Sequence, residues 1–269
     1  MASTERLAAS QRVPAGPLNR SVNTRAVVLA GGRGRRLAPY TSVLPKPLMP
    51  IGDGPILDIV IRGLASCGIV DVTLSVGHLS HLIEAVMGNG TSHQVTINYV
   101  REDEPLGTAA PLLLVDGLDE TFIAMNGDIL TTLDYVDLLN AHRASGSILT
   151  IATHRRTSKI DYGVLQLAEQ GDRHRVCGYE EKPESTAIVS MGIYAMEPGA
   201  LEYIPPKGYF DFPGLVQALL RAGEPVRAYP FDGLWFDIGR SDDYERAIAA
   251  WPQEGRLSHA TSPLGSGAQ

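Results

Sequence analysis

The stretch AVVLAGGRGRRLAPYTSVLPKPLMP, residues 26–50, is the part of the sequence that most constrains the fold. It begins with an apolar run at 26–30, which is typical of a buried strand. The run breaks at Gly31 and Gly32, and Gly34 follows. Because glycine lets the backbone approach a ligand closely, this strand and turn predict a loop that faces phosphate groups.

Two cations follow the glycines, Arg36 and Lys46. Prolines at positions 39, 45, 47 and 50 argue against an α-helix in this segment, since proline lacks the N–H group of the helical ladder. We therefore predict an extended, cationic loop that suits a triphosphate.

Three interpretations of this loop compete. A Walker A loop requires Gly-Lys-Ser/Thr at the start of a helix, and this tripeptide does not occur in the chain. A dinucleotide fingerprint requires G-x-G-x-x-G/A leading into a helix, but Leu37 occupies the third position and Pro39 blocks the helix. A plain glycine-rich turn with solvated arginines is common for a lone G-x-G. The lysine between two prolines disfavours that last interpretation.

The motifs of the whole chain resemble the signature of the sugar-1-phosphate nucleotidylyltransferases, also called nucleoside-diphosphate-sugar pyrophosphorylases. The resemblance is to single-domain members that are similar to mannose-1-phosphate or heptose-1-phosphate guanylyltransferases. The motifs occur in family order and span residues 25 to about 250. They are Leu29-Ala30-Gly31-Gly32-x-Gly34-x-Arg36, Pro45-Lys46-Pro47-Leu48, Leu106-Gly107-Thr108-Ala109, Asn126-Gly127-Asp128, Glu181-Lys182-Pro183, Gly192-Ile193-Tyr194 and Trp235-Phe236-Asp237-Ile238-Gly239. Arg35 departs from the pattern, because many members carry threonine there.

Strand-like and helix-like segments alternate as far as residue 154, which predicts an α/β fold with a mostly parallel sheet. A helix is expected to start near Thr108, and a hairpin is expected at 162–167 and 175–179. Asp211 and Ser241 are expected to cap two later helices. The resemblance implies a Rossmann-like three-layer sandwich with a mostly parallel mixed central sheet, the glycosyltransferase-A-like nucleotidyltransferase fold.

One nucleotidyltransferase domain is expected at 25–251. The segments on either side, 1–24 and 252–269, are polar and unperiodic, and we expect them to be mobile tails.

The net charge of −7 over 269 residues argues against a nucleic-acid partner, so an anionic ligand must be bound by local cations. Cys67 and Cys177 lie outside any C-x-x-C pattern, which favours a reduced compartment. No long apolar run predicts a secretory signal or a membrane partner, so we expect a cytoplasmic protein. The sequence leaves open whether the chain forms a homo-oligomer.

The resemblance also implies roles for individual residues. The catalytic set is Arg36, Lys46, Asp128, Lys182 and Asp237. Of these, Asp128 and Asp237 are expected to hold Mg²⁺, which prefers carboxylate and phosphate oxygens. The residues expected to bind the nucleotide are Leu29, Ala30, Gly31, Gly32, Gly34, Glu102, Gly107 and Thr108. The residues expected to bind the sugar phosphate are Gly163, Glu181, Lys182 and Ser190.

The implied reaction is attack by a sugar-1-phosphate on the α-phosphorus of a nucleoside triphosphate, giving a nucleoside-diphosphate sugar for polysaccharide or glycoconjugate precursors, and pyrophosphate. Glu102 favours GTP, with a mannose-type or heptose-type sugar phosphate, because a carboxylate accepts hydrogen bonds from the adjacent N1–H and amino groups of guanine. UTP, dTTP, ATP and CTP remain alternatives.

Two other functions compete with this enzyme. A non-catalytic nucleotide-sugar-binding regulatory homologue would keep the fold, but the presence of the complete catalytic set favours the enzyme. A dinucleotide-dependent oxidoreductase is disfavoured by the missing fingerprint.

Overall fold

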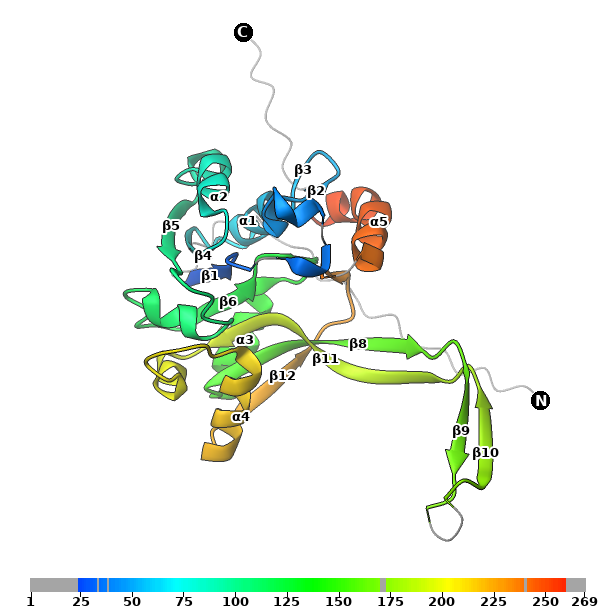
Figure 1. Cartoon of the computed structure of the whole chain (residues 1–269). Coiled ribbons are helices and arrows are strands. Elements are labelled where there is room, and N and C mark those ends of the chain that lie inside the picture. Colours follow the sequence, from blue (N-terminus) through cyan, green and yellow to red (C-terminus); the bar gives the residue numbers. More distant parts are fainter. Residues whose placement is uncertain (1–23, 33, 38, 170–172, 240, 260–269) are drawn as a thin grey trace, which may run out of the picture.

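The centre of the molecule is a seven-stranded mixed sheet (Figure 1). The computed structural model describes residues 24–259, except 33, 38, 170–172 and 240. The strands are β1 (Arg25–Leu29), β4 (Asp71–Val76), β5 (Thr96–Arg101), β6 (Phe122–Asn126), β8 (Leu149–Lys159), β11 (Glu184–Met196) and β12 (Val226–Pro230), in the order β12-β8-β11-β6-β1-β4-β5. Strand β11 runs antiparallel to β6 and β8, and the other neighbours in the described sheet are parallel. The predicted mostly parallel mixed sheet is confirmed.

Helices cover both faces of this sheet, because the buried strands send alternate side chains to opposite sides. In β1, Ala26 and Val28 belong to one hydrophobic cluster and Val27 belongs to another. The first cluster includes residues of α1 (Ile56–Ser66), α2 (Ser80–Met87), α3 (Tyr135–Ser145) and α5 (Ser241–His259). The second includes residues of α4 (Phe212–Ala222) and of the short 3₁₀ helices η5 (Ala110–Leu114) and η6 (Pro198–Tyr203). The predicted three-layer sandwich is confirmed.

The helix ends follow capping chemistry. The carboxylate of Asp211 accepts the backbone N–H of Gly214 at 3.0 Å, so the predicted cap of α4 is confirmed. Asp134 caps α3 in the same way. Ser241 is the first residue of α5, which continues to His259 through part of the segment predicted as a tail. None of the helices in the described ranges combines the length and apolar character needed to cross a bilayer.

The prediction of an α-helix that starts near Thr108 is wrong. The structure has the five-residue 3₁₀ helix η5 there, starting at Ala110. The N–H groups of Ala109 and Ala110 both donate to the carbonyl of Phe210, at 3.0 and 3.1 Å, instead of pointing freely into a ligand site. A contact with a distant segment therefore replaces the expected helix start.

The described residues of the cationic loop after β1 form no α-helix, as the prolines predicted, but the loop is not extended. It forms three turns of 3₁₀ helix, which are η1 (Arg35–Leu37), η2 (Tyr40–Ser42) and η3 (Lys46–Leu48). Proline fits the first turn of such a helix, where its missing N–H is not needed. The short β2 (Pro50–Ile51) and β3 (Gly54–Pro55) then lead into α1.

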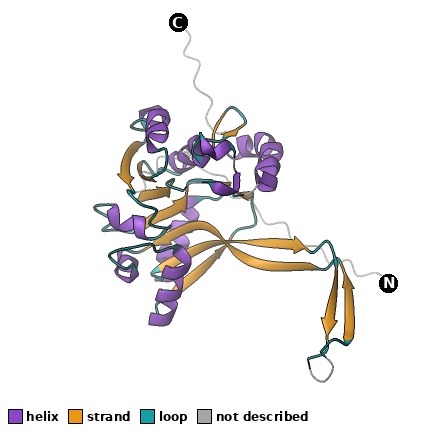
Figure 2. Ribbon diagram, viewed as in Figure 1, coloured by secondary structure: helices purple, strands orange, loops and turns teal. Residues whose placement is uncertain are grey.

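An arm of β-structure projects from the body (Figures 1 and 2). The outer parts of β8 and β11 form a two-stranded ribbon, and β9 (Gly163–Leu167) with β10 (Val176–Glu181) forms a hairpin at its end. The predicted antiparallel hairpin is therefore confirmed. Strand β8 has the same direction as β1 and β6, so the arm leaves the sheet at the edge where those strands end.

A buried histidine lies between α3 and the sheet. His142 contacts Thr150 Oγ1 through Nδ1 at 2.8 Å and Glu197 through Nε2 at 3.1 Å. Burial lowers the pKa of His142, and the nearby charge of Arg143 also lowers it, while Glu197 opposes this shift. The neutral ring is therefore the form that the fold favours.

We predict that the free energy of unfolding falls as the pH decreases below about 6.5, the ordinary histidine pKa, because the unfolded chain then binds a proton that His142 in the fold resists. His142→Gln should cost about 1–3 kcal/mol at pH 7.5 through lost buried hydrogen bonds and should flatten this pH dependence. Urea unfolding at pH 7.5 and 5.5 measures both effects. His81→Gln, at an exposed position, is the control, and an unchanged slope in the His142 variant would contradict the prediction.

Candidate active site

A pocket of about 430 Å³ lies at the carboxyl ends of β1 and β6. All eight residues predicted to bind a nucleotide line it, together with Arg36, Lys46 and Asp128 of the predicted catalytic set. In parallel sheets this edge is the usual place for ligands. The fold thus brings together segments from Leu29 to Gly239.

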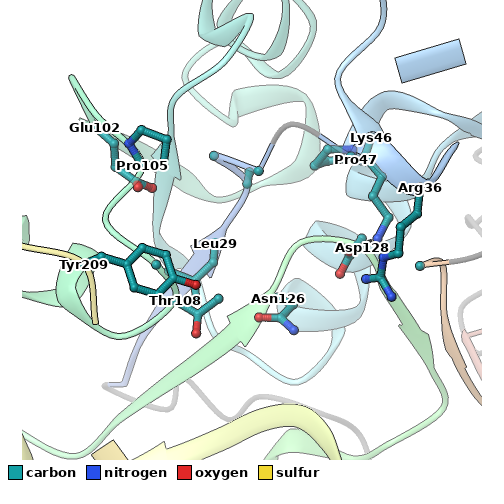
Figure 3. Close-up of a pocket in the computed structure, with 16 residues that line it drawn as sticks. Leu29, Arg36, Lys46, Pro47, Glu102, Pro105, Thr108, Asn126, Asp128 and Tyr209 are labelled. Carbon is teal, nitrogen blue, oxygen red and sulfur yellow. Dashed lines mark hydrogen bonds and ion pairs between the residues drawn. The ribbon is translucent and has the colours of Figure 1, made fainter. Parts of the chain in front are cut away.

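The pocket has two chemically different ends (Figure 3). Glu102, Pro105 and Tyr209 lie at one end, and Arg36, Lys46 and Asp128 lie at the other. Leu29, Thr108 and Asn126 lie between these ends. The site therefore offers a mixed apolar and polar end for an organic group and a charged end for phosphates.

Glu102 is held firmly in the wall at the first end. Its Oε1 accepts a hydrogen bond from Ser75 Oγ at 2.9 Å, and its Oε2 accepts the N–H of Leu106 at 3.1 Å. A Cβ atom added to Gly31 would lie 2.5 Å from Oε1, so any larger residue there would displace this carboxylate. Glu102 thus joins the end of β4 to the loop after β5 and lies against the glycine loop.

The charged end contains a largely buried ion pair. Lys46 Nζ contacts Asp128 Oδ2, and the two side chains are 9% and 21% exposed. The other carboxylate oxygen, Asp128 Oδ1, is buried and has no hydrogen-bond partner among the described residues. A buried acceptor without a donor is costly, so this oxygen marks a place where a positive group belongs.

Strand pairing places Asp237 near Asp128, at the charged end of the pocket. Strand β13 (Trp235–Asp237) pairs with β7 (Ile129–Thr131), and the N–H of Ile238 donates to the carbonyl of Asp128 at 3.1 Å. A Cβ atom added to Gly239 would lie 3.0 Å from both Arg36 Nη2 and Asp237 Oδ1. Glycine at 239 therefore leaves room for the guanidinium beside the carboxylate.

Electrostatics at the charged end favour a bound cation. Burial raises the pKa of Asp237, and the neighbouring Asp128 raises it further, while Lys46 and Arg36 act in the opposite direction. Two close, poorly solvated carboxylates, one with an unpartnered oxygen, fit a hard divalent cation that also takes phosphate oxygens as ligands. The described residues contain no cluster of three or more His, Cys, Asp or Glu side chains that could hold a metal alone. The ligand would then have to complete such a site.

The predicted sugar-phosphate residues are not in the pocket. Gly163, Glu181 and Lys182 lie at the bend between the ribbon and the hairpin of the arm. Tyr179 donates its hydroxyl hydrogen bond to Glu181 beside Gly163, and Lys182 is exposed with a left-handed φ of 49°. Ser190 lies nearer the body, at an irregularity of the ribbon, and donates to the Tyr194 hydroxyl at 3.2 Å. The pocket therefore contains the residues predicted to bind the nucleotide, and these four residues lie apart from it.

The structure adds lining residues that the sequence reasoning did not assign. They are Pro47, Pro105, Asn126, Tyr209 and Gly239. Asn126 belongs to the quoted Asn-Gly-Asp motif, so its position carried a signal that was not used. Tyr209 stands in a loop without a motif, and no sequence feature distinguished it from a surface aromatic residue.

We predict that Asp237→Asn raises the free energy of unfolding of the metal-free protein, because it removes a desolvated charge beside Asp128. The gain should increase as the pH rises above the ordinary aspartate pKa, since the wild-type carboxylate ionises less readily in the fold than in the unfolded chain. Mg²⁺ at millimolar concentration with a nucleotide should raise the melting temperature of the wild type and have a smaller effect on the variant. Asp232→Asn, at an exposed position of the preceding loop, is the control. Equal responses of Asp237→Asn and the wild type to Mg²⁺ would remove Asp237 from the cation site.

The sequence is similar to that of known nucleotidyl transferases. A family model described as nucleotidyl transferase matches residues 25–254. The UTP–glucose-1-phosphate uridylyltransferase of Synechocystis sp. is 32% identical over 244 residues, which are 83% of this chain and 62% of the relative. The mannose-1-phosphate guanylyltransferase of Mycobacterium tuberculosis is 32% identical over 230 residues, which are 83% of this chain and 63% of the relative. The chain thus spans less than two thirds of the length of these relatives.

Solved structures show the same fold. HddC from Yersinia pseudotuberculosis aligns with a TM-score of 0.66 and 24% identity over 85% of this chain and 99% of its own. The same protein in complex with GMP-PN aligns with a TM-score of 0.64 over the same shares.

Proposed function

Because the chain belongs to the nucleotidyl transferase family, we propose that it transfers a nucleoside monophosphate from a nucleoside triphosphate to a sugar-1-phosphate. The products are a nucleoside-diphosphate sugar and pyrophosphate. The observation that carries this proposal is the grouping of Arg36, Lys46 and Asp128 at one end of a preformed pocket, with Asp237 beside them. Similar chemistry is named for the uridylyl and guanylyl relatives, although those proteins are longer than this chain.

In this proposal the charged end binds the triphosphate. Transfer at phosphorus depends mainly on positioning and on stabilising spread negative charge. Arg36 and Lys46 supply fixed positive charge, and the glycine loop after β1 lets backbone N–H groups approach the phosphates. Asp128 and Asp237 would hold Mg²⁺, which when bound neutralises the developing charge on the phosphate oxygens.

The acceptor half of the proposed site comes from the arm. The Lys182 ammonium would bind the phosphate of the sugar-1-phosphate, and Glu181, Gly163 and Ser190 would contact the sugar. Since the arm leaves the sheet at the pocket edge, a bend in its ribbon would bring these groups toward the nucleotide. Water would be excluded only in that closed arrangement, which favours transfer to the sugar over hydrolysis.

The proposal also covers which nucleobase the pocket binds. We favour GTP, because Glu102 lines the end of the pocket opposite the phosphates and a carboxylate can accept the two adjacent donors of guanine. Its two internal hydrogen bonds leave further lone pairs on the same oxygens. A mannose-type or heptose-type sugar phosphate is the matching acceptor of this proposal.

The proposal predicts Mg²⁺-dependent pyrophosphate release in a matrix of GTP, UTP, dTTP, ATP and CTP against several sugar-1-phosphates, with GTP preferred. Glu102→Gln should weaken that preference, because the amide presents one donor and one acceptor. Asp128→Ala should reduce turnover about a hundredfold or more, the usual loss for one strong electrostatic group. Nucleotide binding without turnover for every acceptor would favour a regulatory homologue, and a pyrimidine preference would end the role of Glu102.

Lys182→Ala should raise the KM for the sugar phosphate about tenfold or more, because a hydrogen bond to a charged group is worth roughly 1.5–3 kcal/mol. The KM for the nucleotide should change little, since Lys182 lies outside the nucleotide pocket. Lys207→Ala removes another exposed lysine from a loop of the body and is the matched control. Equal losses for both substrates would place Lys182 in a different role.

A further inference from the structure

Tyr209 is an exposed aromatic residue in the loop before α4. The residue is 68% exposed, and its side chain has no hydrogen-bond partner in the described part of the chain. Yet it lines the pocket at the same end as Glu102 and Pro105 (Figure 3). An exposed apolar ring that faces a pocket, rather than open solvent, is available to a ligand.

The backbone that carries Tyr209 is fixed to the pocket wall. The N–H of Phe210 donates to the carbonyl of Leu106 at 2.8 Å, and the carbonyl of Phe210 accepts from Ala109 and Ala110. Gly107, with a φ of 93°, lies so close to the Phe210 carbonyl that a Cβ atom would collide with it. The position of the Tyr209 backbone is therefore set before any ligand binds.

A second anchor follows directly in the sequence. The N–H of Phe212 donates to Thr108 Oγ1 at 3.0 Å, and the Phe212 ring stacks on Tyr194 with centroids 3.8 Å apart. The segment that bears Tyr209 is thus held by the loop that lines the pocket at two points, Phe210 and Phe212, which directly follow the ring in the sequence. A ring presented from such a fixed backbone loses little conformational freedom when it contacts a ligand.

The surroundings define the chemistry of the group that Tyr209 meets. Leu29 and the side-chain-free Gly31 line the same region as the ring, and a carboxylate stands at its edge. The fixed cations lie at the far end of the pocket. A flat group with N–H donors along its edge fits this end, whereas a phosphate does not.

We propose that Tyr209 is the platform on which the nucleobase stacks, an inference that rests on the proposed nucleotide substrate. The ring supplies a face that every base can use, and Glu102 supplies the edge contact that distinguishes bases. A purine covers more of the ring than a pyrimidine, so the platform adds to the preference for GTP over UTP.

Calorimetric titration tests the platform without turnover. GTP with Mg²⁺ should bind Tyr209→Ala about tenfold or more weaker than the wild type, in line with alanine substitutions of stacked aromatic residues. Tyr209→Phe should bind GTP nearly as the wild type does, because stacking needs the ring and not the hydroxyl. Inorganic tripolyphosphate, which has no base, should bind all three proteins equally.

The control is Leu220→Ala, which truncates a 58% exposed apolar side chain on the adjacent α4 and should leave GTP binding unchanged. Equal GTP affinity of Tyr209→Ala and wild type overturns the platform, as does an equal loss in Tyr209→Ala and Tyr209→Phe. A parallel loss of tripolyphosphate affinity assigns Tyr209 a structural role and also overturns it. Failure of the wild type to bind any nucleotide overturns both proposals, whereas GTP binding that depends on Tyr209 without turnover overturns only the proposed function.

Discussion

The contact between the Lys46 ammonium and the Asp128 carboxylate joins the two halves of the central site. Lys46 belongs to the loop after β1, and Asp128 follows β6, the neighbour of β1 in the sheet. A buried ion pair gains little stability by itself, since desolvation offsets the attraction, but the loss of one partner leaves an uncompensated charge. The loop of 3₁₀ turns is therefore tied to the sheet at the point where phosphates are proposed to bind.

The two carboxylates at the same end of the pocket destabilise the fold, and they are the groups proposed to bind a cation. Asp128 keeps one oxygen without a donor, and Asp237 stands beside it with a raised pKa. A fold selected for stability alone would fill this place with apolar side chains or a further cation. The electrostatic cost is tolerable because Asp237 ends β13, which pairs with β7, and Asp128 directly precedes β7. A cation with phosphate ligands would relieve it.

Local patterns predicted the sheet and the cap of α4 because short-range chemistry decides them. The cap at Asp211 follows from residues within a few positions of the helix start. The expected helix at Thr108 failed because its N–H groups bond to Phe210, about a hundred residues away. Long-range contacts of this kind leave no local pattern in one sequence.

The residues of the candidate site also fall into two groups, those that belong to local motifs and those that long-range contacts bring to the pocket. Glycines, Lys46 and Asp128 belong to compact motifs, and the pocket contains them. Tyr209 enters through the hydrogen bonds that join its loop to the segment 106–110, which no spacing in the sequence indicates. The distance of Lys182 from the pocket was equally invisible, because the motif fixes the residue type and not the course of the ribbon that carries it.

The projecting hairpin has a further consequence for how the chain behaves in solution. Strands β9 and β10 pair only with each other in the described structure, so each has an outer edge with free backbone donors and acceptors. Such edges recruit foreign strands, and apolar side chains such as Leu165 and Val176, both more than half exposed, increase that tendency. Glu180 and Glu181 on β10 place like charges where a second hairpin would have to align. The repulsion between these charges thus opposes fibrous self-association of the hairpin, whose described residues belong to neither hydrophobic cluster.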